Sequence, residues 1–203
     1  MSLERALELA AAAAGRGYPN PTVGAVVVRP DGSIVGEGVS EPAGGPHAEA
    51  TALDAAGEAA RDGTLFVTME PCAHHGRTPP CVDRIVASGV ARVVAGCADP
   101  NPRAEGGAQR LRAAGVDVEL LDLPEARRQN EAWRTWVALG RPYVILKLAS
   151  TVDGRVAVPG AVDTDPVLSD LLCAGEPTVV LEWSHRNDSH VRFPPEHVNR
   201  VLH

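Results

Sequence analysis

Apolar and polar positions repeat with two different periods along the first 140 residues. Residues 3–15 carry apolar side chains at helical spacing, and a stretch with two glycines and two prolines then ends that helix. Two segments rich in β-branched residues, 23–28 and 33–39, flank a Pro-Asp-Gly sequence at 30–32, which favours a tight turn. The beginning of the chain therefore predicts one helix followed by a β-hairpin.

Helical and strand patterns alternate from residue 48 onward. They predict helices over 48–60, 82–88, 104–114 and 124–139, and short strands over 64–69, 91–97 and 116–121. Strands that alternate with helices form a sheet with helices on both faces. We therefore predict an α/β fold with three layers, α/β/α, and a mixed sheet over residues 1–140, followed by a short C-terminal extension over 141–203.

The bulk composition restricts the class of protein. A chain of 203 residues with 44% hydrophobic content can bury one good core. The net charge of −7 provides no basic field of the kind on which general nucleic-acid binding relies. No run of 18 apolar residues occurs, and the Ala-rich start carries Glu4, Arg5 and Glu8, which indicates a surface helix. We expect a soluble cytoplasmic protein that binds neither nucleic acid nor a membrane.

The cysteines favour metal binding over disulfides. The chain has four of them, Cys72, Cys81, Cys97 and Cys173, which is an even number. A chain of this size with its own core does not need disulfides for stability, so a reducing compartment and a metal site are the preferred interpretation.

Two motifs combine into a candidate metal site. "PHAEATAL" contains His47 and Glu49, and "MEPCAHHGRTPPC" contains Cys72 and Cys81; each leads into a predicted helix. Helix N-termini present free N–H groups and a positive dipole end, which favour a thiolate over a thiol. One imidazole and two thiolates suit one Zn²⁺ ion and leave a fourth position open for water. An open position indicates a catalytic site.

The carboxyl group of Glu49 completes this interpretation. Zinc lowers the pKa of bound water, and a carboxylate that is not a ligand can accept that proton and pass it to a leaving group. His-x-Glu with a later Pro-Cys and a second Cys is the signature of zinc-dependent base deaminases. A structural zinc site with four protein ligands is the alternative, and His74 or His75 would then be the fourth ligand.

Four segments carry a resemblance to a known family: "NPTVGAVVV", "GGPHAEATAL", "MEPCAHHGRTPPC" and "ADPNP". Eight residues separate Cys72 from Cys81, whereas cytidine-type deaminases usually have Cys-x-x-Cys. Over residues 1–140 the sequence resembles the deaminase domain of the bacterial riboflavin biosynthesis proteins RibD. The resemblance implies a cytidine-deaminase-like fold. It also implies hydrolytic loss of ammonia from the 2-amino carbon of a 2,5-diamino-6-(ribosylamino)pyrimidin-4-one 5′-phosphate.

The resemblance also implies substrate contacts. Asn20 would hydrogen-bond the pyrimidine, and the backbone at Ala73 and the side chain of His74 would lie over its ring. Asp99 and Asn101 would hold the ribose or the 5-amino group. Each of these residues also has a purely structural interpretation. Asn20, which lies between two prolines, could be a turn residue, and the segment at Asp99 could be a loop that ends a strand.

Two further features concern the substrate. Arg77 would pair with the phosphate, because a planar cation suits that group, and His75 is expected to face solvent. Relatives usually have an aromatic residue and a His where this chain has Val39 and Ser40. If that His touches the substrate, the chain lacks one donor. Deamination of a related aminopyrimidine in a specialised pathway therefore stays an alternative.

The extension resembles part of a second domain. Residues 141–160 are similar to the opening of the RibD reductase domain, and Lys147 and Asp153 match positions that serve the reductase. Residues 141–203 are too few for a dinucleotide-binding sheet, and no Gly-rich fingerprint follows a strand, so NADPH is not expected. The extension is interpreted as an incomplete reductase-like remnant or a partly disordered tail.

The C-terminal part also bears on partners. Trp133 and Trp136 lie three residues apart and are expected to bury against the extension or a partner chain. We expect a homo-oligomer, a dimer, that binds a small pyrimidine nucleotide. A non-catalytic, deaminase-like partner of a separate reductase is the alternative from a different class.

Overall fold

The computed structural model describes residues 2–16, 19–104, 106–146 and 178–181. Its centre is a five-stranded sheet with the order β2-β1-β3-β4-β5. The strands are β1 (Gly24–Val28), β2 (Ile34–Val39), β3 (Thr64–Val67), β4 (Arg92–Ala95) and β5 (Asp117–Leu120). Strand β1 is antiparallel to both β2 and β3, whereas β3, β4 and β5 run parallel to one another. The sheet is therefore mixed, as predicted.

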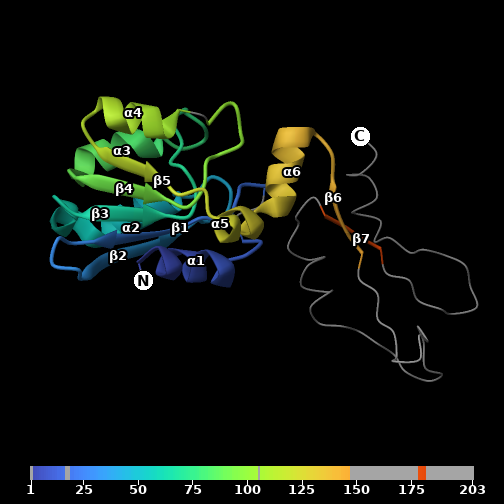
Figure 1. The fold of residues 1–203 in the computed structure, drawn as a ribbon, viewed down its shortest axis with the longest axis horizontal. Helices are drawn as coiled ribbons and strands as arrows, with labels where there is room; N and C mark the ends of the chain where they lie inside the picture. The colour runs from blue at the N-terminus through green and yellow to red at the C-terminus, as the bar shows by residue number, and fades with distance from the viewer. Residues whose placement is uncertain (1, 17–18, 105, 147–177, 182–203) are drawn as a thin grey trace, which may run out of the picture.

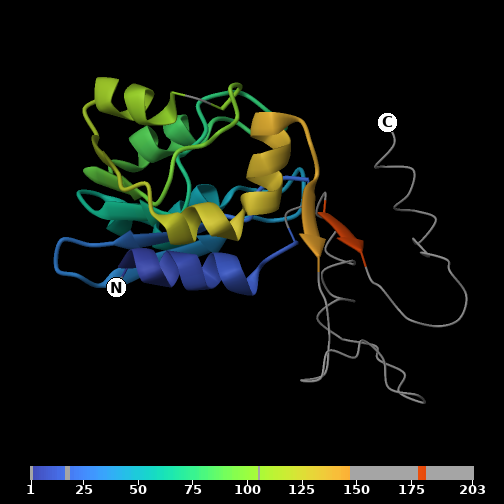
Figure 2. The same ribbon diagram turned by 45° about the vertical axis from the view of Figure 1, so that its right-hand side comes forward.

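Helices cover both faces of this sheet (Figure 1). Helix α1 (Ser2–Ala12) packs on β1 with α5 (Pro124–Gln129) beside it, and Figure 2 shows these two helices side by side. Helix α2 (Ala48–Ala56) packs on β1 and β2 across the opposite face, next to α3 (Cys81–Ser88). A short 3₁₀ turn, η1 (Gly57–Ala60), follows α2, and α4 (Gly107–Ala113) contacts α3 and β5. The three-layer α/β/α architecture is confirmed.

Strand β1 separates two hydrophobic clusters. Its side chains alternate, so Ala25 and Val27 join the large cluster beneath α2 and α3, while Val26 and Val28 join a small cluster beneath α1. All five residues of β1 are buried, as expected for a central strand covered on both sides. The sheet therefore has an apolar core on each of its faces, with the larger one on the side of α2 and α3.

Glycines in β2 bring α2 close to the sheet. A Cβ atom at Gly38 would lie 2.3 Å from the carbonyl oxygen of Ala48, and one at Gly36 would lie 2.1 Å from that of Ala52. No side chain fits in those positions unless the helix moves away. The glycines therefore fix the height of α2 above the sheet, and with it the position of the residues at the N-terminus of α2.

The C-terminal helical segment differs from the prediction of one helix over 124–139. The structure has two helices, α5 and α6 (Glu131–Leu139), which meet at Asn130. Asn130 has φ −123° and ψ 30°, and its buried side chain bonds Thr22 twice. The Thr22 N–H donates to Oδ1 at 2.8 Å, and Nδ2 donates to the Thr22 carbonyl at 2.8 Å. This pairing competes with helical geometry and breaks the helix.

Little of the C-terminal extension is described. Strand β6 (Tyr143–Leu146) pairs in parallel with β7 (Thr178–Leu181). Lys147, Asp153 and most of the expected reductase-like segment lie outside the described residues. Trp133 belongs to the large hydrophobic cluster that also contains residues of β1, α2 and α3, while Trp136 is 47% exposed. The expectation that both would bury against the extension or a partner therefore does not describe Trp133. Among the described helices, none is long and apolar enough to cross a membrane.

We predict that Asn130→Asp destabilises the fold by about 2–3 kcal/mol, because the Thr22 carbonyl loses its only described donor and faces a buried carboxylate. Urea denaturation monitored by circular dichroism measures this change. Glu131→Gln, at the exposed neighbouring position, is the control and is expected to alter stability by less than about 0.5 kcal/mol. Equal stabilities of the Asn130→Asp variant and the unmodified chain would contradict the stabilising role given to the hydrogen bonds between Asn130 and Thr22.

Candidate active site

Three ligand-type side chains converge beside the sheet. His47 is the N-cap of α2 and makes no side-chain capping bond, Cys81 is the first residue of α3, and Cys72 lies in the loop after β3. His47 Nδ1 lies 3.2 Å from Cys81 Sγ and 3.6 Å from Cys72 Sγ. All three ligand atoms lie within 4.8 Å of one another. These distances suit one metal ion, and the imidazole and two sulfurs fit zinc.

The two cysteines are electrostatically coupled. Cys72 Sγ accepts the backbone N–H of Cys81, at the start of α3, at 3.4 Å. The hydrogen bond between the two sulfurs lowers the pKa of Cys72 and raises the pKa of Cys81 far above its ordinary value. Without a cation, one thiolate is therefore stabilised by the remaining thiol. A divalent cation has to displace that second proton when both sulfurs become ligands.

The site offers three protein ligands. Within the described part of the chain, His74 and His75 are not members of the metal-sized group. His75 is exposed, as expected from the sequence. The alternative of a structural zinc centre with one of these histidines as the fourth ligand is therefore not supported, and the arrangement is the open type found in catalytic zinc sites.

Glu49 is the second residue of α2, in the first turn, and is only 4% exposed. Burial, followed by the negative charge of Cys72, raises the pKa of this carboxyl group to about 7. A carboxyl group with such a pKa can both accept and return a proton near neutral pH. Glu49 lines the same cavity as His47 and Cys72 but does not belong to the ligand group.

A cavity of about 390 Å³ opens above this group. Five of the six predicted substrate-binding residues line it: Asn20, His74, Arg77, Asp99 and Asn101. Ala73 is not among the lining residues. Its N–H donates to the Ala104 carbonyl at 3.4 Å, and its own carbonyl accepts a hydrogen bond from Arg110. The backbone of Ala73 is thus used within the fold, and its contact with a substrate stays a prediction.

The loop after β4 places two polar groups in the cavity. Asp99 Oδ1 accepts the N–H of Asn101 at 2.8 Å, and Asn101 Oδ1 accepts the N–H of Arg103 at 3.1 Å. These bonds make the segment a well-defined loop, as the local interpretation expected. Asp99 Oδ2 and Asn101 Nδ2 have no partner among the described residues, so both can serve a ligand. Burial raises the pKa of Asp99 to about 6.

Other lining residues were not assigned to the site from the sequence. Trp133 reaches the cavity from α6, and Ser40 and Met69 line it as well. Ser40 Oγ accepts the N–H of Val23 at 2.9 Å, so this hydroxyl group supports the start of β1. His74 Nδ1 is buried without a partner in the described structure. The sequence gave two signals among these residues: Ser40 was noted as a departure from relatives that bears on the substrate, whereas the paired tryptophans did not indicate a cavity.

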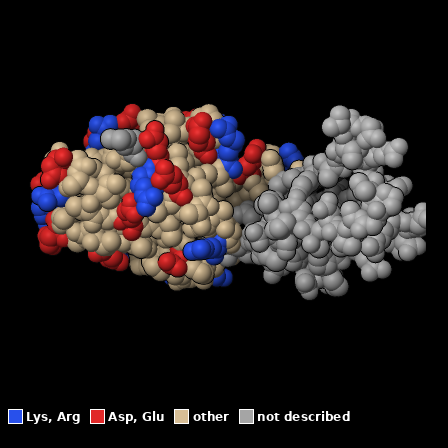
Figure 3. Space-filling model, turned by 90° about the horizontal axis from the view of Figure 1, so that it is seen from below, with Lys and Arg blue, Asp and Glu red and all other residues tan. Residues whose placement is uncertain are grey.

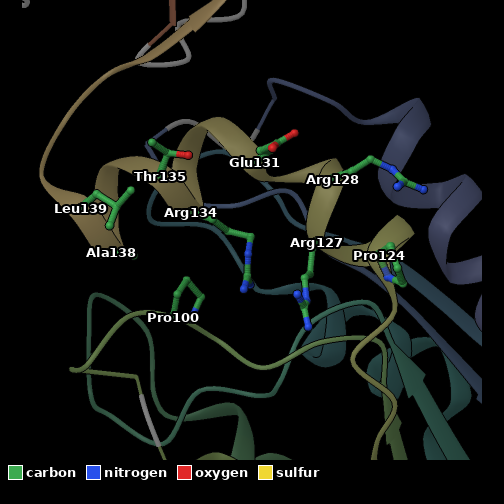
Figure 4. Close-up of a pocket in the computed structure, with 9 residues that line it drawn as sticks. All are labelled: Pro100, Pro124, Arg127, Arg128, Glu131, Arg134, Thr135, Ala138 and Leu139. Carbon is green, nitrogen blue, oxygen red and sulfur yellow. The ribbon is translucent and has the colours of Figure 1, made fainter.

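A second hollow of about 450 Å³ lies between Pro100 and helices α5 and α6 (Figure 4). Its arginines already have partners. Arg127 pairs with Asp122, Arg128 pairs with Glu125, and Arg134 donates to the Ala98 carbonyl at 2.8 Å. Among the described residues, those that line this hollow include no metal-ligand group, so the cavity at His47 is the candidate active site.

Acidic and basic side chains are mixed on one face of the described structure (Figure 3). Figure 3 shows acidic and basic side chains interspersed over the face seen from below. Neither sign forms a continuous field there. Together with the net charge of −7, this distribution gives no support for a nucleic-acid ligand.

Comparison with known proteins identifies the domain. Residues 1–97 match the model of the cytidine and deoxycytidylate deaminase zinc-binding region. The riboflavin biosynthesis protein RibD of Aquifex aeolicus is 52% identical over 157 residues, which are 76% of this chain and 44% of that protein. RibD of Escherichia coli is 51% identical over 158 residues, 77% of this chain and 43% of that protein. The chain thus spans less than half of the length of these relatives.

Solved structures give the same result. A Thermotoga maritima diaminohydroxyphosphoribosylaminopyrimidine deaminase/5-amino-6-(5-phosphoribosylamino)uracil reductase aligns with a TM-score of 0.75 and 42% identity, covering 84% of this chain and 51% of that one. RibD of Acinetobacter baumannii aligns with a TM-score of 0.74 and 40% identity, covering 84% of this chain and 49% of that one.

The fold and the site together define a zinc-binding domain of the cytidine deaminase class. Within that class, the N-terminal part of the chain is a deaminase domain of the RibD type.

We predict that Asp99→Asn stabilises the metal-free protein by about 1–2 kcal/mol at pH 7. Asp99 has a folded pKa of about 6, above its ordinary value, so the folded state binds this proton more tightly than the unfolded state does. The stability contributed by the protonated form is complete below pH 4 and is lost as the pH rises through 6. The amide keeps the Oδ1 acceptor for Asn101 and carries no charge.

Urea denaturation with EDTA and a reductant at pH 7 and at pH 4 measures this effect. The advantage of the Asp99→Asn variant is expected to disappear at pH 4. An equal advantage at both pH values would show that ionisation of Asp99 is not its cause.

Proposed function

We propose that the chain is a zinc-dependent hydrolase that deaminates 2,5-diamino-6-(ribosylamino)pyrimidin-4-one 5′-phosphate in riboflavin biosynthesis. One observation carries this proposal: a three-ligand nitrogen and sulfur site shares a cavity with a buried carboxyl group that is not a ligand. The similarity to RibD proteins supports the choice of substrate, although the chain spans only part of them.

His47, Cys72 and Cys81 would hold the zinc ion. When bound, zinc supplies Lewis acidity that lowers the pKa of water at the open coordination position. Glu49 accepts a proton from the attacking water and delivers it to the departing amino group. The exocyclic C–N bond to the 2-amino group breaks and ammonia leaves, while the remaining proton of the added hydroxyl group moves to a ring nitrogen and a carbonyl group forms. Burial of Glu49 keeps bulk water from competing for that proton.

The cavity residues would orient the pyrimidine nucleotide. Asn20 would hydrogen-bond the ring, while the unpartnered Nδ1 of His74 would meet a polar group of the substrate. Asp99 Oδ2 and Asn101 Nδ2 provide one acceptor and one donor for the ribose or the 5-amino group. Arg77, exposed at the edge of the cavity, would pair with the phosphate.

The division of the chain follows the same proposal. Residues 1–140 would form the deaminase domain, and residues 141–203 a reductase-like segment. A homodimer in the cytoplasm is the expected form. Size-exclusion chromatography with light scattering measures the oligomeric state directly.

We predict that Glu49→Gln lowers the rate of ammonia release at least about 100-fold, because an amide cannot shuttle the proton. The assay couples ammonia release from the riboflavin-pathway intermediate to a glutamate dehydrogenase reaction, on protein with one measured zinc per chain. Glu58→Gln, a change at a carboxyl group that is 96% exposed, is the control and is expected to retain full activity. An unchanged rate in zinc-loaded Glu49→Gln protein would exclude the proposed role of Glu49.

A second candidate function keeps the chemistry and changes the substrate. Ser40 lines the cavity, and its hydroxyl group is engaged by the backbone of Val23, which leaves one fewer donor for a ligand than a His would offer. This observation favours a related aminopyrimidine. Ammonia release measured across a panel of aminopyrimidine nucleotides separates the two candidates by their kcat/KM values.

A non-catalytic role as a partner of a separate reductase has less support. A zinc site closed by four protein ligands would favour it, whereas the described residues provide three. Zinc-loaded protein that releases no ammonia from any member of the panel would restore this alternative.

A further inference from the structure

The second ring nitrogen of His47 faces a hydroxyl group. Nδ1 points at the two sulfurs, while Nε2 lies 3.3 Å from Thr78 Oγ1. A neutral imidazole has one N–H and one lone pair, and a metal ligand has to present the lone pair. If Nδ1 is the ligand atom, the proton lies on Nε2 and needs an acceptor. Among the described residues, Thr78 Oγ1 is the acceptor that lies within hydrogen-bond distance of Nε2.

We propose that Thr78 is a positioning residue for the metal centre. Its hydroxyl oxygen accepts a hydrogen bond from Nε2–H of His47. This bond fixes the tautomer and the orientation of the imidazole ring, so that Nδ1 faces the ion. In metal sites, such partners of ligating histidines typically contribute 10- to 100-fold to metal affinity. The inference rests on the metal site and does not depend on which substrate the protein deaminates.

The helix alone does not orient this ring. His47 is the N-cap of α2, its side chain makes no capping bond, and the residue is only half-buried. The backbone at the start of α2 therefore fixes the Cα position of His47 but leaves rotation about its side-chain bonds. Among the described residues, the ring nitrogens contact the two sulfurs and the hydroxyl group of Thr78. Thr78 thus supplies the restraint on the side of the ring away from the metal.

Thr78 is itself held by a stiff segment. Its carbonyl accepts the N–H of Gly76 at 3.2 Å, and Pro79 and Pro80 follow it. Pro80 is the N-cap of α3, so the next residue is the ligand Cys81. Because proline fixes φ and restricts the residue before it, the backbone of Thr78 has a restricted position relative to Cys81. The long segment between the two cysteines thereby connects the third ligand to the orientation of the first.

The test compares zinc affinities of the full chain and two variants. Thr78→Val keeps the β-branched shape without the hydroxyl group, and Thr78→Ser keeps the hydroxyl group. Competition with a chromophoric chelator under reducing conditions is expected to show 10- to 100-fold weaker zinc binding for Thr78→Val and less than about 3-fold for Thr78→Ser. Equal affinities of Thr78→Val and the unmodified chain would overturn the proposal.

A substrate-binding role of Thr78 gives a different result. Thr78 also lines the cavity, so its loss could weaken substrate binding instead. In that case the KM of Thr78→Val rises while its zinc affinity is unchanged, which contradicts the proposal. Thermal melting of the metal-free proteins in EDTA provides the folding control, and the three melting temperatures are expected to agree.

A second measurement uses the unmodified protein. Nitrogen-15 spectra of the zinc-loaded chain labelled at histidine report which ring nitrogen of His47 carries the proton. A protonated Nε2 that exchanges slowly with solvent is expected, because Thr78 holds that hydrogen. Protonation at Nδ1, or rapid exchange at Nε2, would overturn the proposal even if the Thr78→Val variant does not fold.

Discussion

The site depends on the simultaneous approach of two helix starts to one pair of sulfurs. The N-terminus of α3 provides Cys81 and an N–H donor to Cys72, and the N-terminus of α2 provides His47. Helix α2 could not bring His47 to this point if it stood higher above the sheet. Gly36 and Gly38 exclude that arrangement, because they allow the helix backbone to rest on β2. A few missing side chains in a strand therefore determine the distance between metal ligands.

The cavity above the ligands is built by segments that are distant in the sequence. Asn130 bonds the backbone of Thr22, which holds the Asn20 loop against the start of α6, and the same helix contributes Trp133 to the cavity wall. This closure has an energetic cost. Burial raises the pKa values of Glu49 and Asp99, so the folded protein disfavours the ionised forms of both side chains. The proposed chemistry nevertheless requires these carboxyl groups in the buried region. Stability and reactivity are opposed in this part of the protein.

Much of the fold follows from local pattern. The hairpin of β1 and β2, the later alternation of strands and helices, and the mixed sheet were all predicted, because periodic burial and turn residues act over short distances. The metal ligands were also predicted, since His47, Cys72 and Cys81 occur in motifs whose residue types have few other uses together. The uninterrupted helix over 124–139 was wrong. Its break at Asn130 depends on a partner 108 residues away, which no local propensity reveals.

By itself, the sequence indicated which residues are candidates for the chemistry and determined which three side chains converge as metal ligands, because ligand type, helix-start position and spacing are properties of short segments. Tertiary structure alone decided how those residues are supported. The contact of Thr78 with His47 Nε2, the engagement of Ser40 by Val23, and the internal use of the Ala73 backbone all depend on how separate loops pack. A hydrogen bond between distant segments has a direction and a length that follow from the whole fold, whereas a motif records only the order of its residues.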